Sequence, residues 1–306
     1  MESGANRPGR AAALVVGAMA LFGLIDNFMR VAAETGGLWQ FHLLRGLVAV
    51  ALLGPAAWLM GARLRPLRPG RVLLRTCLNA SAMVIYFGAV GIMPIAQAVA
   101  GLFTAPLWVV LFSVLLFGER VGAWRLSAVA LGFAGVLLAL GLRAEEVTPW
   151  SLLPVLAGAL YGMGNLVTRV WCAGEGTLTL LGAFFGALAL VGGVGCVGLA
   201  LHPLPVAEGT DGFLTRGWVA PTGAFLLVTL VQAVGSLVGV GLSIRGYQIA
   251  NPTLVSVMEN TLLVFATLWA VAIWGEVPGP VETLGLALVT AAGVMIAARE
   301  PRRAVA

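Results

Sequence analysis

The sequence has little charge for its length of 306 residues. Only 10% of its residues are charged, 60% are hydrophobic, and the mean hydropathy is +0.99. Soluble domains have about 25% charged and about 45–50% apolar residues, so a water-soluble fold is excluded. A membrane-spanning helix needs roughly 20 apolar residues. The length therefore predicts about ten spans and leaves no large domain outside the bilayer.

Cysteine and histidine are also scarce. Cys77, Cys172 and Cys196 lie far apart, in or at the end of apolar segments. This spacing fits neither a disulfide framework nor a zinc site. With only two histidines, the chain does not favour the His/Asp metal cluster or Ser–His pair that a membrane-embedded enzyme would need. We expect no enzymatic activity, no metal and no cofactor.

The apolar runs, bounded by charges, glycine and proline, predict an all-α integral membrane protein. The connections between the runs are short, which makes neighbouring helices antiparallel. The sequence lacks the alternating strands of about ten residues that build a membrane β-barrel. The predicted helices cover residues 11–33, 38–60, 71–91, 94–117, 122–142, 149–171, 177–201, 218–244, 251–274 and 280–298.

The arginines predict the orientation in the membrane. All 18 basic residues are arginine, and with both termini on one side most of them, including Arg75, fall on that side. Arg143 and Arg216 fall in the opposite loops. The positive-inside rule then places both termini in the cytoplasm of a multi-pass inner-membrane protein. We therefore attribute the pI of about 9.9 to arginines that orient the chain in a lipid bilayer and not to binding of a nucleic acid partner.

The two halves of the chain resemble each other. Ala20–Gly23 matches Ala159–Gly162, and the same register aligns Asp26 with Asn165. Further on, Phe117-Gly118-Glu119 matches Trp274-Gly275-Glu276, each at the end of a long apolar helix. Five helices in each half must enter the membrane in opposite senses. We therefore predict two inverted repeats, residues 1–145 and 146–306, as in secondary transporters whose substrate site lies near the midplane.

Three segments resemble a known family. The run from Pro94 through Thr104–Trp108 to Leu116–Val121 resembles the fourth helix of EamA-type transporters of the drug/metabolite transporter superfamily. Ala250–Glu276 is similar to the ninth helix of that family, and Arg45–Pro55 to the second. The resemblance extends over residues 11–298. It implies a ten-helix inner-membrane carrier whose helices one to four and six to nine surround the pathway, with helices five and ten at the periphery.

The resemblance also implies a substrate class. Members of the family move amino acids, nucleoside-derived metabolites, vitamins and other small organic solutes. The stretch from Tyr247 to Glu276 is more similar to members linked to S-adenosylmethionine or riboflavin than to amino-acid exporters. Asn260 departs from the aromatic residue expected at its position.

Charged side chains inside the bilayer are the first candidates for the site, because each costs at least ~2.5–3.5 kcal/mol to insert. Asp26 is expected to contact Arg30 one helical turn away, or to meet a cationic or amine-bearing substrate. Arg45 can receive a substrate carboxylate or pair with Asp26. Glu259, near the middle of its helix, can exchange a proton, bind a positive substrate or hydrogen-bond between helices.

The neutral candidates have a functional and a structural interpretation. His42 is either an interfacial residue or a pH-sensitive one, and polar residues can bind substrate or hold helices together. Pro106 and Pro252 are expected to begin or kink helices four and nine. The glycine pairs 158/162, 182/186 and 235/239 predict close helix packing. The remaining candidates for substrate contact are Asn79, Asn165, Asn260, Gln97, Tyr86 and Trp108.

Together these features predict a secondary transporter that moves a small polar organic metabolite by alternating access, with proton coupling through Asp26 or Glu259 as one option. The alternative is a facilitative carrier of the S-adenosylmethionine or riboflavin type. A membrane-embedded enzyme is the disfavoured third class. The sequence leaves open the substrate, the direction of transport, the coupling ion and whether the chain forms a homodimer.

Overall fold

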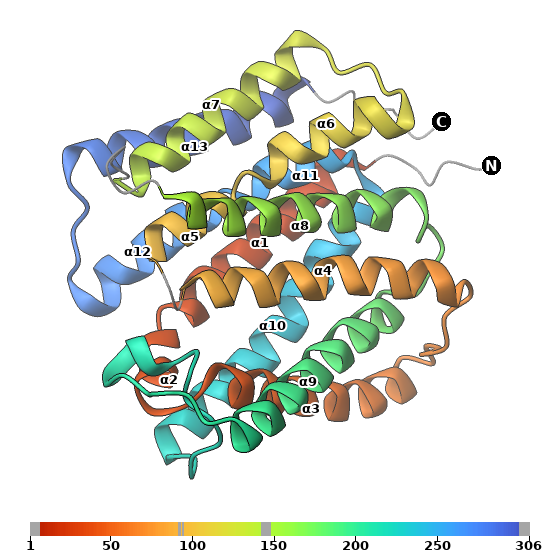
Figure 1. Cartoon of the computed structure of the whole chain (residues 1–306). Helices are drawn as coiled ribbons and strands as arrows, with labels where there is room; N and C mark the ends of the chain where they lie inside the picture. The colour runs from red at the N-terminus through yellow and green to blue at the C-terminus, as the bar shows by residue number, and fades with distance from the viewer. Residues whose placement is uncertain (1–6, 91–92, 94, 142–147, 300–306) are drawn as a thin grey trace.

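The computed structural model describes residues 7–90, 93, 95–141 and 148–299, which form a bundle of α-helices (Figure 1). No strand occurs in these ranges. Nine segments of the described chain are long and apolar enough to cross a membrane, and Ala123–Ala139 is a shorter apolar helix. The predicted all-α fold with ten spans is confirmed.

Several of the spans consist of two helices. The first contains α1 (Pro8–Asp26) and α2 (Met29–Thr35), the fourth α5 (Ile95–Leu102) and α6 (Ala105–Phe117), and the ninth α11 (Pro252–Glu259) and α12 (Leu262–Trp274). The sixth joins the short 3-10 helix η2 (Pro149–Ser151) to α8, and η3 (Gly209–Gly212) precedes α10. The remaining helices are α3 (Leu38–Leu59), α4 (Pro69–Val90), α7 (Ala123–Ala139), α8 (Leu152–Val170), α9 (Thr177–Leu201), α10 (Gly223–Ile249) and α13 (Pro280–Arg299).

Prolines contribute to these divisions, as predicted. Pro106 lies in the first turn of α6, and Pro252 begins α11. A proline at a helix start loses no hydrogen bond, because the first N–H groups have no partner within the helix. The break after Asn260 has no proline beside it. Pro94 lies outside the described residues.

The kink between α1 and α2 overturns the predicted contact between Asp26 and Arg30. Asn27 donates from Nδ2 to the carbonyl oxygens of Gly23 (2.6 Å) and Ala266 (3.1 Å), which fixes the kink against α12. Arg30 contacts another partner, because Nη1 lies 3.5 Å from Glu276 Oε1. The prediction assumed the i, i+4 geometry of a straight helix, which the kink removes.

The eighth span was predicted too early in the sequence, at residues 218–244. Helix α10 begins at Gly223, where the Thr222 hydroxyl accepts a hydrogen bond from Phe225 N (3.1 Å). Such an N-cap fixes the start of a helix. The helix then continues to Ile249. As a result Tyr247 lies inside the span and is buried.

The two halves of the bundle show the same helix contacts. When each span is replaced by the span five positions away along the chain, the same pairs of helices are in contact. Helix α3 packs on α9 and α7 on α13, while the pair α4 and α8 corresponds to the pair α10 and α1. The fourth and ninth spans also end alike, with Gly118 (φ +63°) and Gly275 (φ +72°) in the left-handed conformation. Helix α6 ends on the side of the termini and α12 on the opposite side (Figure 1). This is the packing that inverted repeats produce. The boundary predicted between the repeats, at residues 145 and 146, lies outside the described residues and stays a prediction.

Two of the three predicted glycine pairs lie at tight helix contacts. A Cβ at Gly158 would lie 2.6 Å from the carbonyl oxygen of Gly101, and one at Gly239 would lie 2.7 Å from the Phe22 ring. The pair Gly182 and Gly186 does not fit the prediction. A Cβ at Gly182 would meet only Leu53 Cδ1 at 3.7 Å, and one at Gly186 would have nothing within 4 Å.

We expect Gly46→Ala to destabilise the protein by about 1–3 kcal/mol, the usual cost of overpacking. The added Cβ would lie 2.6 Å from Phe185 O and 2.8 Å from Ala189 N, so the backbone of α3 or α9 must shift. The same change at Gly186, which lies inside α9 and has open space, is the control and should leave the stability unchanged or raise it by up to about 1 kcal/mol. Equilibrium unfolding in mixed micelles measures both. Equal stability of the two variants would contradict the close contact.

Candidate functional site

The bundle surrounds a cavity of about 190 Å³. Its walls come from spans one to four and six to nine, and neither α7 nor α13 contributes a lining residue. Helices α7 and α13 lie side by side at one edge of the bundle (Figure 1). The arrangement implied by the family resemblance is therefore present.

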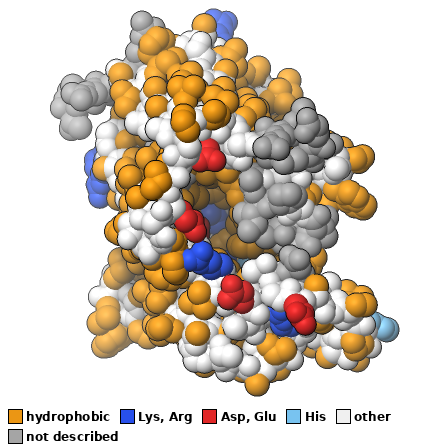
Figure 2. Space-filling model, turned by 90° about the vertical axis from the view of Figure 1, so that its left-hand side faces the viewer, with side chains coloured by type: hydrophobic (Ala, Val, Ile, Leu, Met, Phe, Trp, Pro, Cys, Tyr) orange, Lys and Arg blue, Asp and Glu red, His pale blue; other side chains and the backbone are white. Residues whose placement is uncertain are grey.

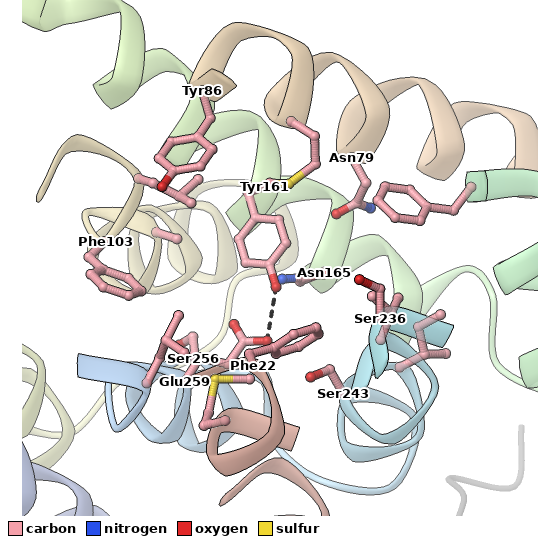
Figure 3. A pocket seen from close by; sticks show the side chains of 18 of the residues that line it. Phe22, Asn79, Tyr86, Phe103, Tyr161, Asn165, Ser236, Ser243, Ser256 and Glu259 are labelled. Carbon is pink, nitrogen blue, oxygen red and sulfur yellow. Dashed lines mark hydrogen bonds between the residues drawn. The ribbon is translucent and has the colours of Figure 1, made fainter. Parts of the chain in front are cut away.

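Glu259 lies in this cavity between two tyrosines. Its Oε1 accepts a hydrogen bond from the Tyr161 hydroxyl (3.0 Å), and its Oε2 accepts one from the Tyr247 hydroxyl (2.8 Å). Figure 3 shows the contact with Tyr161 and, beside it, Asn165. Glu259 is 6% exposed, and its carboxyl group forms no ion pair with another described side chain. It links α8, α10 and α11 through neutral donors.

Asp26 marks the open end of the cavity. It is exposed, and its Oδ1 accepts a hydrogen bond from Gln232 Nε2 (3.1 Å), which also donates to Ile25 O (3.0 Å). Asp26 lines both the cavity and an adjoining groove that contains Glu276 and Glu282. Figure 2 shows acidic and arginine side chains around a hollow on the face opposite the termini. The cavity therefore opens on that face.

Two arginines complete the charged lining. Arg45 on α3 is 7% exposed, and its Nε has no hydrogen-bond partner in the part of the chain that the structure describes. Arg75 on α4 is 3% exposed and donates from Nε to Thr168 Oγ1 (2.8 Å) and from Nη1 to Leu180 O (3.4 Å). Arg75 was counted among the arginines on the side of the termini and was not predicted as a site residue. The structure places it in the cavity wall, where it donates to neutral acceptors.

Three of the predicted site residues lie away from the cavity. His42 is buried, with its ring 5.0 Å from that of Phe87 and neither nitrogen hydrogen-bonded. Gln97 donates to Ser151 Oγ (2.8 Å), and Trp108 donates to Thr104 Oγ1 (3.1 Å). The predicted residues that line the cavity are Asp26, Arg45, Asn79, Tyr86, Asn165, Glu259 and Asn260.

Sequence reasoning missed the hydrogen-bonding role of the tyrosines. The chain has three, Tyr86, Tyr161 and Tyr247, and all of them line the cavity. Only Tyr86 was predicted from the sequence, as a residue in contact with the substrate. The rarity of tyrosine in so apolar a chain was the available signal, because a buried hydroxyl group needs a hydrogen-bond partner.

Hydrogen bonds tie the connections together on the side of the termini. Glu175 is buried, and its two carboxylate oxygens accept hydrogen bonds from Leu67 N (2.9 Å) and Arg68 N (2.7 Å). Gln248, near the end of α10, donates to Glu175 O (2.9 Å) and accepts from Thr177 Oγ1 (3.2 Å). We call Glu175, Gln248 and the two backbone N–H groups the closed-side network. It joins the α3–α4 connection, the α8–α9 connection and α10.

Comparisons with known proteins agree with this fold and cavity. Residues 9–141 match the model of the EamA-like transporter family. Residues 9–141 belong to that family. The resemblance predicted from the motifs is thereby confirmed for these residues, and the apolar helices are those of a multi-pass membrane protein.

The chain is also similar to individual proteins along most of its length. It is 29% identical over 314 residues to a riboflavin transporter of Rhizobium johnstonii, covering 98% of this chain and 95% of that protein. It is 24% identical to an S-adenosylmethionine uptake transporter of Rickettsia felis, covering 76% of this chain and 73% of that protein. It is 24% identical to the pseudopaline exporter CntI of Pseudomonas aeruginosa, with 74% of each covered.

A solved crystal structure shares the fold. It superposes with a TM-score of 0.78 over 94% of this chain and 96% of that one, at 18% sequence identity. At this identity the match shows the architecture alone. It supports the ten-span arrangement that forms the cavity.

Proposed function

We propose that the chain is a secondary transporter that moves a small polar organic metabolite across the inner membrane by alternating access. The observation that carries the proposal is a cavity walled by corresponding spans of both halves, open on one face. The opposite side is held together by the closed-side network. The halves, residues 1–145 and 146–306, would rock against each other around this cavity.

The proposal includes the orientation and the absence of catalysis. Both termini lie in the cytoplasm, so the cavity faces the periplasm in this conformation. The solute passes through unchanged, with no cofactor and no chemical step. Glu259 exchanges a proton during the cycle, since its two tyrosine partners can donate to a carboxylate or share a proton with it. These inferences rest on the arginine distribution, on the relatives and on the contacts of Glu259.

A second candidate is facilitative transport of a flavin or of S-adenosylmethionine. The similarity to a riboflavin transporter extends over 98% of the chain. Aromatic side chains at the cavity, among them Phe22, Tyr86 and Phe103, offer faces for a planar ring (Figure 3). The hydroxyl and amide groups between them can bind the polar parts of such a solute.

A thermal-shift screen of the detergent-purified protein tests the proposal. Amino acids, nucleosides, S-adenosylmethionine and flavins form the panel. A solute at 100 times its dissociation constant stabilises the folded state by about 2.7 kcal/mol. We expect a stabilising solute whose effect disappears in Asp26→Asn or Glu259→Gln. The exposed Glu34, which lies outside the cavity, provides the control Glu34→Gln. A shift that survives both cavity variants would contradict the proposed site.

A further inference from the structure

Arg45 stands apart among the charged side chains that line the cavity. Of the four, Asp26, Glu259 and Arg75 each have a hydrogen-bond partner in the protein. Arg45 forms no hydrogen bond and no ion pair within 4.0 Å in the described part of the chain. It is nonetheless 7% exposed, and it is part of the cavity lining.

Two aromatic rings hold the guanidinium in place without neutralising it. The Arg45 Cζ atom lies 5.0 Å from the centroid of the Phe41 ring and 5.9 Å from that of Phe185. A cation within about 6 Å of a ring centroid is attracted to the face of the ring. These contacts leave the N–H groups that are not covered by the rings free to donate. The neighbouring His42 has no hydrogen-bond partner among the described residues.

Asp26 attracts Arg45 only at a distance and does not contact it. The Asp26 carboxylate and the Arg45 guanidinium do not lie within 4.0 Å of each other. The ion pair found among the described residues joins Arg30 and Glu276. Asp26 is engaged by Gln232. A guanidinium stays charged in a protein, and a buried charge without a partner is costly. The missing partner of Arg45 is therefore expected from a molecule in the cavity.

We propose that the cavity takes a solute with a carboxylate group and that Arg45 binds this group. The inference rests on the proposed transport function and narrows its substrate class. A planar carboxylate matches the fork of N–H donors of one guanidinium. A doubly charged phosphate fits less well, because Asp26 lines the same cavity and would repel it. Aromatic side chains of the cavity lining, among them Phe87 and Phe184, favour a solute with an apolar or aromatic body beside the carboxylate.

The affinities of the purified full-length protein for benzoate and benzamide test this assignment. The two probes have the same ring and nearly the same size, and only benzoate is an anion. Isothermal titration should show at least tenfold tighter binding of benzoate by the wild type. This preference should disappear in Arg45→Gln. The control Arg30→Gln removes an arginine outside the cavity, which is paired with Glu276, and should keep the preference.

Equal binding of both probes by the wild type would overturn the proposal, as would a benzoate preference that persists in Arg45→Gln. If Arg45→Gln does not fold, Arg45→Lys replaces it. Lysine lacks the planar fork, so benzoate should bind severalfold more weakly while benzamide is unaffected. Unchanged benzoate binding by Arg45→Lys would overturn the proposal.

Proteoliposome flux separates this inference from the function on which it rests. Arg45-dependent benzoate binding in a protein that transports no solute of the screened panel would reject the transport function and leave the carboxylate site. Transport of a neutral solute, with no benzoate preference, would reject the carboxylate site and leave the transport function.

Discussion

Replacing Glu259 by Gln should abolish proton-driven accumulation of solute while the protein remains folded. The amide has nearly the same size. One of Tyr161 and Tyr247 can still donate to its oxygen, and the hydroxyl oxygen of the other can accept from its NH2 group, so the packing of α8, α10 and α11 is preserved. An amide cannot bind and release a proton near neutral pH. Uptake into proteoliposomes between about pH 5 and pH 8 measures the effect. We expect at least a tenfold loss, with no remaining pH dependence.

The control for this variant is Glu34→Gln, the same change at an exposed acid outside the cavity. It should retain wild-type uptake at every pH. Solute exchange without a proton gradient should survive in Glu259→Gln if the residue serves only in coupling, and should be lost if the residue also binds the solute. Uptake by Glu259→Gln with the kinetics and pH dependence of the wild type would contradict a proton-carrying role.

Replacing Glu175 by Gln should open the cavity toward the side of the termini. The carboxylate accepts hydrogen bonds from Leu67 N and Arg68 N, and an amide oxygen cannot replace both of its oxygens. A hydrogen bond to a charged group contributes about 1.5–3 kcal/mol. If this contact exists only in the closed arrangement, its loss shifts the equilibrium by a factor of about 10 to 100.

Labelling of a cysteine inside the cavity measures that shift. The three native cysteines are replaced first, and Ser243→Cys then places a thiol in the cavity wall. A membrane-impermeant maleimide added to inside-out vesicles should label this thiol at least ten times faster in Glu175→Gln. In the same cysteine-replaced protein with Ser243→Cys, adding Glu34→Gln should leave the labelling rate as slow as it is without that change. Equal rates in all three would show that the closed-side network does not control access.

The sequence predicted the spans well because each span is a local property of the chain. Apolar length and arginine-rich ends indicate a helix wherever they occur, and the motif around Gly118 and Gly275 identified two corresponding helix ends. The eighth span was misplaced because apolar residues extend beyond its true start. There the cap at Thr222 determines where the helix begins.

The contacts inside the cavity were less predictable because they join distant parts of the chain. Glu259 was recognised as a buried acid, but its partners Tyr161 and Tyr247 come from two other helices. Arg75 was counted on the side of the termini because it lies near a helix end. Its place in the cavity wall depends on a hydrogen bond to Thr168 on α8. The Asp26–Arg30 contact failed because Asn27 kinks the helix between them.

Solute counterflow tests the transport function most directly. Proteoliposomes containing the wild-type protein are loaded with an excess of an unlabelled solute that stabilises the protein, and then diluted into a trace of the same solute in labelled form. A carrier that works by alternating access should accumulate the label transiently above its external concentration, and protein-free liposomes should not. Binding without any such accumulation would contradict the account of this protein as a secondary transporter.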